Sequence, residues 1–572
     1  MTQSCSIGTF TEKHAAFRAP MTQLAAVVAV LTVAASVRPT EAAPRLAAAF
    51  SDHAVLQRDM PVRVWGWADA GEAITVEFAG QRQTATVDGT GRWQVRLMPL
   101  AASDEPRDLV VTGNGTVTIR DVLVGEVWLA SGQSNMGSPL SSVDNAATVL
   151  PEASDPLLRF FTVVKATAAE PLADVKGAWQ ATTPDTARSF SAVAYFFAKE
   201  LRTRLNCPVG ILHASWGGTA AHTWLGIDSL RHAPSLAKYV TQWDQAVVKH
   251  REVLAHPELS EQYVKEIAAW QADVAPAYNA AMKAYKAAGS TGPKPEPARP
   301  MPKNPDPMGM PDPNSRPSTP GVIYHAMIAP LAPFAMRGVI WYQGEANGGA
   351  GFEYRTLLPR LIGDWRARWG QCDFPFLIVQ LPGWDHSKDP PERHQWPWLR
   401  EAQLLTVQAV PKTGLAVAID VGDPRDVHPA HKTDIGLRLA LAARKIAYGE
   451  NVVHSGPAYR DFAIADGRVR LRFDEIGGGL AIGQSPWLAK GVEQFPADRL
   501  IGFTIAGDDR KWHDADAKID GDSVVVHSAA VPNPVAVRYG WANAPRCNLA
   551  NREVLPASPF RTDDWAMPAV TK

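Results

Sequence analysis

The sequence predicts a multidomain α/β protein in which a parallel sheet of about five strands is flanked by β-rich modules. In the middle of the chain short apolar strands alternate with helical segments, whereas both flanks alternate apolar and polar residues with a period of two. A chain of 572 residues also exceeds what one core ordinarily holds. The balance of 57 basic and 58 acidic residues gives no electrostatic reason to expect a nucleic-acid partner.

A short apolar segment near the amino terminus is typical of an export signal. The run from Leu24 to Ser36 is followed by small residues, and it is too short to cross a bilayer comfortably. Met21 precedes this run and is an alternative start. We expect residues 1–43 to be a signal peptide and the mature chain to be periplasmic or secreted, as in bacteria. No later run reaches the roughly 20 apolar residues of a membrane-spanning helix, so we expect no membrane insertion.

Residues 44–123 show the alternation of half-buried strands. The segments 74–78 and 93–97 place apolar side chains at every second position, and a turn rich in glycine at 88–91 separates them. This pattern predicts a small antiparallel β-sandwich. A structural role is favoured over contact with carbohydrate.

The segments 124–227 and 321–449 are expected to form the central α/β domain. Ser191 is placed to cap a helix that runs to Leu205, and Pro208 ends it before the next strand. A second helix is expected at 433–444. With the strand that precedes Ser134, the expected parallel strands are 209–214, 338–342, 375–380 and 415–420.

An insertion at 228–320 interrupts this domain. Its first part, 238–286, has apolar residues at helical spacing and predicts a helical hairpin, whereas 293–320 is crowded with proline and predicts an extended surface loop. The insertion either walls a cleft or is solvated and without a role. Residues 450–572 return to β alternation and are expected to form a carboxyl-terminal β-rich module and tail.

Groups with catalytic potential follow several of the predicted strands. The carboxyl ends of parallel strands meet at one edge of a sheet, so these groups are expected to lie close together. Ser134 stands where a nucleophile would be. Gly217 and Gly218 allow a backbone N–H to approach a ligand, and the carboxamide of Gln343 can donate to a developing oxyanion. His428 lies on a later loop and can accept the serine proton.

The residues around Ser134 and His428 argue against one related fold. An α/β-hydrolase elbow needs glycine two residues after the serine, and Met136 stands there. Asp426 also lies close to His428 in sequence rather than on a separate strand.

Four blocks of sequence resemble those of the sialate O-acetylesterase-like carbohydrate esterases, within the wider SGNH hydrolase class. The similarity covers nearly the whole mature chain and implies a three-layer α/β/α hydrolase domain. The blocks are Gly-Gln-Ser-Asn-Met, Trp-Gly-Gly-Thr, Trp-Tyr-Gln-Gly-Glu-Ala-Asn and Asp-Val-His-Pro.

This resemblance implies roles for individual residues. Ser134 resembles the nucleophile, His428 the general base and Asp426 the orienting acid. The wider class commonly carries this acid three residues before the histidine, where Arg425 stands here, so Asp423 is the reserve.

The resemblance also implies how the oxyanion and the sugar are bound. We expect no metal, because none of the cysteines falls in a metal-ligand spacing, and no other cofactor. The oxyanion donors would be the backbone N–H groups of Ser134 and Gly218 and the side chain of Gln343, although Gly217 remains an alternative to its neighbour. Other candidates for contact with substrate are Trp216, Gly217, Glu345 and Asn347.

The implied substrate is an O-acetylated oligosaccharide. Plant cell-wall glycans such as xyloglucan or xylan are preferred over sialic acids because of the neutral charge balance, the 19 tryptophans and the long insertion. A sialate carboxylate would want an arginine clamp. The sequence does not say whether Arg355, Arg400 or Arg425 faces the cleft. Two alternatives remain: a non-catalytic carbohydrate-binding protein on an esterase scaffold, and a peptidase with the same triad logic.

Overall fold

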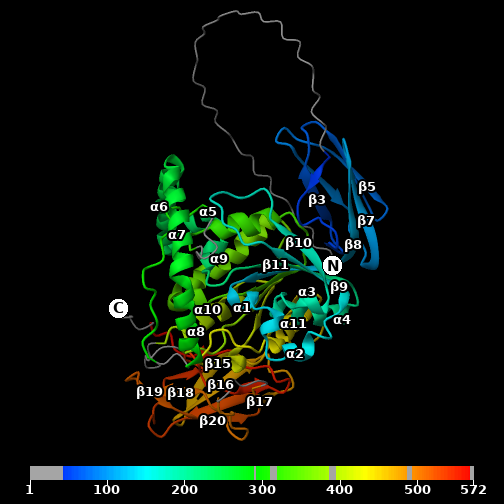
Figure 1. The fold of residues 1–572 in the computed structure, drawn as a ribbon. Coiled ribbons are helices and arrows are strands. Elements are labelled where there is room, and N and C mark those ends of the chain that lie inside the picture. The colour runs from blue at the N-terminus through cyan, green and yellow to red at the C-terminus, as the bar shows by residue number, and fades with distance from the viewer. Residues whose placement is uncertain (1–42, 289–291, 310–317, 386–393, 486–491, 567–572) are drawn as a thin grey trace, which may run out of the picture.

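The computed structural model describes residues 43–288, 292–309, 318–385, 394–485 and 492–566. The expected signal peptide lies almost wholly outside these residues. Figure 1 shows a central α/β domain with a β module at each end and a column of helices along one side. None of the helices formed by the described residues is long and apolar enough to cross a membrane.

The central sheet has the strand order β10-β9-β11-β8-β12-β13-β14. All neighbouring pairs are parallel except β10 with β9. The bounds are β8 Thr116–Gly132, β9 Asp155–Val163, β10 Gly177–Thr182, β11 Val209–Ser215, β12 Gly338–Tyr342, β13 Phe376–Val379 and β14 Thr413–Ala416.

Strand β9 joins the five strands that the sequence predicts. Arg159 interrupts its apolar run, yet this side chain is buried. Its guanidinium donates to the Asp121 carboxylate at 2.8 Å and to the carbonyl oxygens of Pro156 and Asp121. A buried cation is tolerated because every donor group has an acceptor, and this compensation is invisible in the local pattern.

Strand β14 is shorter than the expected strand 415–420. It ends at Ala416, and a 3-10 turn follows at Ile419–Val421. Arg438 of helix α11 donates to the Val417 carbonyl oxygen at 2.6 Å and to both carboxylate oxygens of Asp420 at 2.6 and 2.7 Å. The pairing of Arg438 replaces the hydrogen bonds that a longer strand would have made.

The longer helices of the domain pack in pairs, α4 with α11 and α9 with α10. The Ser191 hydroxyl caps α4 as predicted, because it accepts a hydrogen bond from the Ala194 N–H at 3.2 Å. Asn206 ends α4 in the left-handed conformation. The helix bounds are α2 Ala146–Val149, α3 Pro184–Ala187, α4 Ala192–Leu205, α9 Gly351–Trp369, α10 Trp396–Ala409 and α11 Thr433–Ile446.

Strand β8 belongs to two modules at once. Its first residues pair antiparallel with β7, and its last residues pair parallel with β11 and β12. A boundary at residue 123 would therefore fall inside one continuous strand. The other strands of the amino-terminal module are β1 Arg45–Leu46, β2 Val55–Gln57, β3 Val62–Trp67, β4 Ala73–Phe78, β5 Gln81–Thr86, β6 Arg92–Leu97 and β7 Ser103–Thr112.

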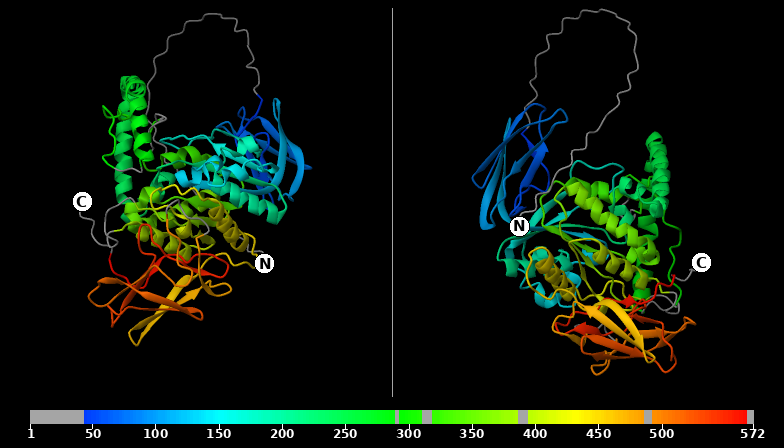
Figure 2. Two further views of the ribbon diagram at one scale, coloured as in Figure 1. Left: turned by 60° about the horizontal axis from the view of Figure 1, so that its bottom comes forward. Right: turned by 180° about the vertical axis from the view of Figure 1, so that it is seen from behind.

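The insertion forms three long helices in place of the expected hairpin. After α5 (Ile227–Arg231) come α6 (Ala237–Ala255), α7 (Pro257–Asp273) and α8 (Ala275–Ala287), and Figure 2 shows them standing beside the α/β domain. Pro257 occupies the first turn of α7, where its missing N–H is harmless.

The carboxyl-terminal module consists of short antiparallel sheets. Their strand orders are β15-β16-β21-β20, β17-β23 and β19-β18-β22-β24. The bounds are β15 Ala458–Ala465, β16 Arg468–Asp474, β17 Leu480–Ile482, β18 Phe503–Ala506, β19 Trp512–Asp514, β20 Asp516–Asp520, β21 Ser523–His527, β22 Ala536–Tyr539, β23 Leu549–Asn551 and β24 Phe560–Arg561.

A buried carboxylate ties the amino-terminal module to the central domain. Glu126 of β8 accepts hydrogen bonds from Arg58 at 2.6 Å, from Arg337 at 2.8 and 3.1 Å, and from the Tyr448 hydroxyl at 3.1 Å. Burial alone would raise the pKa of the Glu126 carboxyl, but the two guanidinium groups outweigh it and hold the pKa below its ordinary value.

Replacing Glu126 with alanine should lower the free energy of unfolding by about 3–5 kcal/mol, because it leaves two arginines without their shared partner. Urea titration measures this change. The carboxylate's contribution is present above its pKa in the unfolded chain and is lost as the pH falls through its folded pKa, so the variant should lose less stability than the wild type on acidification. An equal loss in both proteins would contradict this account.

Candidate active site

The turn after β8 brings Ser134 out of the sheet. Gly132 has φ +137°, and a Cβ there would lie 2.1 Å from the Tyr342 carbonyl oxygen, so only glycine fits between β8 and β12. The Gln133 N–H donates to that same carbonyl at 3.0 Å. Helix α1 (Ser134–Gly137) then begins with the serine itself, at the carboxyl edge of the sheet.

His428 reaches this serine from a loop 294 residues later in the chain. Its Nε2 lies 2.7 Å from the Ser134 hydroxyl oxygen. Asp426 is the nearer of the two predicted acids: its Oδ1 accepts the His428 backbone N–H at 2.9 Å and lies 3.7 Å from the imidazole Nδ1. The Asp423 carboxylate instead accepts from the backbone N–H and the guanidinium of Arg425, at 2.9 and 3.3 Å.

A pocket of about 430 Å³ opens over Ser134 and His428. None of the described residues of the insertion 228–320 lines it. Its other lining residues are Gly137, Ser138, Pro139, Thr162, Val163, Lys165, His213, Ser215 and Gly217.

Gly217, rather than Gly218, lies against the serine. A Cβ on Gly217 would lie 3.2 Å from the Ser134 Cβ, whereas Gly218 is exposed and does not line the pocket. Gly218 has φ +74°, a left-handed conformation that favours glycine, so the turn itself accounts for this residue. The sequence favoured Gly218 with Gly217 as the alternative, and the contact with Ser134 favours Gly217.

Gln343 has contacts different from those expected of an oxyanion donor. It is fully buried, and its Nε2 donates to the Asn347 side-chain oxygen at 2.8 Å and to the Thr219 carbonyl and Gln133 side-chain oxygens at 3.2 Å. Its own oxygen accepts from the Tyr354 hydroxyl at 2.7 Å. The amide therefore braces the residue that precedes Ser134 and does not line the pocket.

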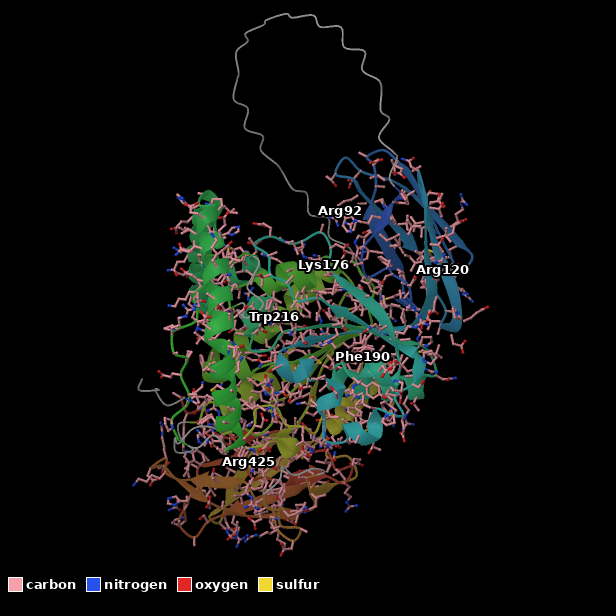
Figure 3. All side chains as sticks on the ribbon, viewed as in Figure 1. Arg92, Arg120, Lys176, Phe190, Trp216 and Arg425 are labelled. Carbon is pink, nitrogen blue, oxygen red and sulfur yellow. The ribbon has the colours of Figure 1, made fainter. Side chains whose placement is uncertain are left out.

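The other predicted contact residues also lie beside the pocket rather than in its wall. The Asn347 oxygen accepts from the Ala221 N–H at 2.9 Å, and Glu345 accepts from Asn135 at 2.5 Å. Trp216, labelled in Figure 3, is partly buried against the core. Glu345 and Asn347 thus support the loops around Ser134.

His213, Ser215 and Lys165 line the pocket although the sequence reasoning did not select them. His213 Nε2 lies 2.8 Å from the Ser215 hydroxyl oxygen. Burial, with a smaller effect of the Lys165 charge, lowers the pKa of His213 to about 4, so the imidazole is neutral at pH 7. Ser215 is the last residue of β11, so its place at a strand end was a signal in the sequence. Nothing local marked the loop residue Lys165.

The three arginines considered for binding a carboxylate do not line the pocket. Arg400 is fully buried and donates to four backbone carbonyls, those of residues 381, 382, 542 and 543. Arg355 pairs with Glu401, and Arg425, labelled in Figure 3, pairs with Asp423. Among the described residues that line the pocket, Lys165 is the one lysine or arginine.

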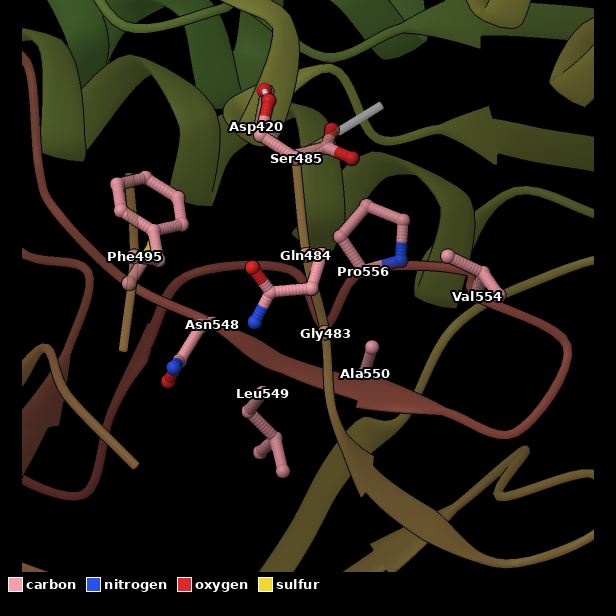
Figure 4. Close-up of a pocket in the computed structure, with 11 residues that line it drawn as sticks. Asp420, Gly483, Gln484, Ser485, Phe495, Asn548, Leu549, Ala550, Val554 and Pro556 are labelled. Atoms are coloured by element: carbon pink, nitrogen blue, oxygen red, sulfur yellow. Dashed lines mark hydrogen bonds between the residues drawn. The ribbon is translucent and has the colours of Figure 1, made fainter. Parts of the chain in front are cut away.

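Other cavities of the described residues differ from this pocket in position or size. One of about 570 Å³ lies beside the insertion and is lined by Trp243, Tyr324 and Asp364 among others. Another, shown in Figure 4, lies near Asp420 and β23 and has only about 10 Å³, the space of a single water. Neither contains a residue of the Ser134–His428 pair.

A hydroxyl in contact with an imidazole, beside a glycine turn, is an arrangement suited to acyl transfer. Comparison with known proteins agrees. The profile of the family described as carbohydrate esterase, sialic acid-specific acetylesterase, matches residues 318–446. The sialate O-acetylesterase of Rattus norvegicus is 28% identical over 567 residues, which cover 90% of this chain and 94% of that protein.

The human sialate O-acetylesterase is 28% identical over 452 residues, 72% of this chain and 73% of that protein. The crystal structure of a carbohydrate acetylesterase from Xanthomonas citri aligns with a TM-score of 0.72 and 38% identity, covering 91% of this chain and 100% of that one. The chain belongs to the sialate O-acetylesterase-like carbohydrate esterases. The esterase is therefore a carboxylic ester hydrolase of the carbohydrate acetylesterase type.

Exchanging Asp426 for asparagine in the esterase should lower kcat by about 10- to 100-fold, less than the roughly 10⁴-fold effect at a fully buried triad aspartate, because Asp426 is exposed and 3.7 Å from the imidazole. Hydrolysis of p-nitrophenyl acetate measures it. Asp423→Asn is the matched control and should stay within about threefold of wild type. A larger loss in the control would make Asp423 the orienting acid.

Proposed function

We propose that the esterase releases acetate from O-acetylated sugars by a serine-dependent mechanism, with Ser134 as nucleophile and His428 as general base. The observation that carries this proposal is the 2.7 Å contact between the Ser134 hydroxyl oxygen and His428 Nε2 at the floor of an open pocket. A binding protein on the same scaffold would have no need to keep this contact.

In the first step, Ser134 Oγ attacks the acetyl carbonyl carbon while His428 accepts its proton. The backbone N–H groups of Ser134 and Gly217 would stabilise the oxyanion, in place of Gly218 and Gln343. The sugar oxygen then leaves with the proton from His428. Water, activated by the same imidazole, attacks the acetyl group on Ser134 and releases acetate.

The preferred substrates in this proposal are neutral plant cell-wall oligosaccharides derived from xyloglucan or xylan. Their recognition needs no fixed counter-charge, and no arginine is among the described residues that line the pocket. The nearly equal numbers of basic and acidic residues agree with a neutral ligand. Export through the segment 1–43 would bring the esterase to such glycans outside the cytoplasm.

Sialate is a second candidate because of Lys165. This lysine is exposed, lines the pocket and can attract a carboxylate as a point charge. The mammalian relatives are named sialate O-acetylesterases.

Acetate release from acetylated xyloglucan and xylan oligosaccharides, and from O-acetylated sialic acid, separates these substrates. We expect release from the plant oligosaccharides, and Ser134→Ala should leave only background hydrolysis. Release from sialate alone would favour the second candidate. Absence of serine-dependent release from all of them would overturn the proposed function.

Lys165→Gln provides an independent measure of substrate charge. With a neutral oligosaccharide, kcat/KM should stay within about twofold, because the lysine contributes no essential charge pair. If sialate is the substrate, kcat/KM of Lys165→Gln should be about 10-fold or more below that of the wild type. Added salt should lower kcat/KM of the wild type in the same way, because it screens the charge of Lys165. The kinetics of the wild type and of Lys165→Gln on both substrates decide between these cases.

A further inference from the structure

A lysine is buried directly behind the catalytic loop. Lys432 follows His428 by four residues, and only 1% of its surface is exposed. Its Nζ donates to the Asn135 side-chain oxygen at 2.5 Å and lies 5.4 Å from the centroid of the Tyr342 ring. A buried ammonium requires compensation, and no carboxylate of the described residues lies within ion-pair distance of it.

Asn135 connects this lysine to a buried carboxylate. Its Nδ2 donates to Glu345 Oε1 at 2.5 Å and to the Val427 backbone carbonyl at 2.9 Å. The primary amide therefore has a cation at its oxygen and an anion at its nitrogen, and this pairing fixes its orientation. Asn135 is the residue after Ser134, and Val427 is the residue before His428.

The carboxylate of Glu345 is held only at one of its oxygens. Within the described part of the chain, its Oε2 is buried and has no hydrogen-bond partner. Such a group is sensitive to the charges around it. Its contact with Asn135 is therefore the main restraint on its position.

We propose that Lys432, Asn135 and Glu345 form a charge-bridged positioning network that holds the His428 loop against the Ser134 turn. Asn135 makes the connection between the two segments, and the opposite charges of Lys432 and Glu345 lock its amide. Lys432 and Glu345 act through Asn135 and are positioning residues. This inference rests on the proposed roles of Ser134 and His428.

The charges that face the network come from several elements. Burial lowers the pKa of Lys432 to about 7, and the carboxylates of Glu345 and Asp426 oppose this effect. Burial raises the pKa of Glu345, against the Asn135 hydrogen bond and the charges of Lys432 and His428. Two further neighbours are Tyr342 and His431. Burial and the charge of Glu345 raise the pKa of Tyr342, and the His431 ring nitrogens are hydrogen-bonded to the carboxylates of Asp144 and Asp434.

The network therefore gives activity a specific dependence on pH. The ammonium is present below about pH 7 and is lost as the pH rises through that value, which weakens the bond to Asn135. Accordingly, kcat should decline on the alkaline side in the wild type. Lys432→Met should remove this decline and lower kcat by about 10- to 100-fold at pH 6, because a small displacement of His428 is costly.

Glu345→Gln tests the charge without removing the hydrogen-bond acceptor. Loss of the anion should lower the pKa of Lys432 further, so the alkaline decline should move to lower pH by about one unit or more. The double variant Lys432→Met/Glu345→Gln should be less impaired than the two single effects predict, because their charges compensate. KM should stay within about twofold throughout.

The control is Lys238→Met, which breaks the pair of the exposed Lys238 on the insertion with Glu353 of α9 (2.6 Å) and should leave kcat and its pH profile unchanged. Thermal unfolding and the burst of p-nitrophenol report the folded, reactive fraction. An unchanged kcat in Lys432→Met, or a Glu345→Gln profile that overlays the wild type, would overturn the network. If Lys432→Met does not fold, the Glu345→Gln profile alone decides, whereas activity in Ser134→Ala would refute the proposed function instead.

Discussion

The parallel register of β8 between β11 and β12 determines where the groups around the pocket can lie. Gly132 is opposite Ser215 on one side and opposite Tyr342 on the other. Three chain segments therefore leave the sheet at the same level. A slip of one residue would turn every side chain of β8 to the opposite face and carry Ser134 away from both neighbours.

Behind the pocket, uncharged amides fill the space between these segments. Gln133, Gln343 and Asn347 are buried and hydrogen-bonded to one another, and Gln403 adds a bond to the Gln343 carbonyl. A buried amide with an unmade bond is costly, so this layer has few alternative arrangements. The proposed catalytic groups thus rest on a polar layer that is rigid although it contains few charges.

Local patterns in the sequence were sufficient for strands β8, β11, β12 and β13, the capped helix α4 and the meeting of Ser134 with His428. They were insufficient where a distant partner decides the structure. The charged side chain of Arg159 interrupts the apolar pattern of β9, and its acceptor Asp121 belongs to another module, so the strand could not be recognised locally. Similarly, Arg438 binds the Val417 carbonyl just beyond the end of β14. It lies on a helix that begins 17 residues after that strand ends.

In the site, the contacts that bear on the finer assignments also come from distant segments. Gly217 and Gly218 are chemically identical, and only the direction of the backbone distinguishes them. Gln343 has the right chemistry for a donor, but three neighbours accept its amide hydrogens. Lys432 resembles an ordinary loop lysine in the sequence, and only the packing of β12 and α1 around it reveals that it is buried.

Arg400 has a consequence for biosynthesis. Its buried guanidinium donates to two carbonyls within its own domain and to those of residues 542 and 543 in the carboxyl-terminal module. A nascent polypeptide lacks the latter pair until residues 542 and 543 have been synthesised. The interior around α10 therefore cannot reach its final hydrogen bonding before these residues are present.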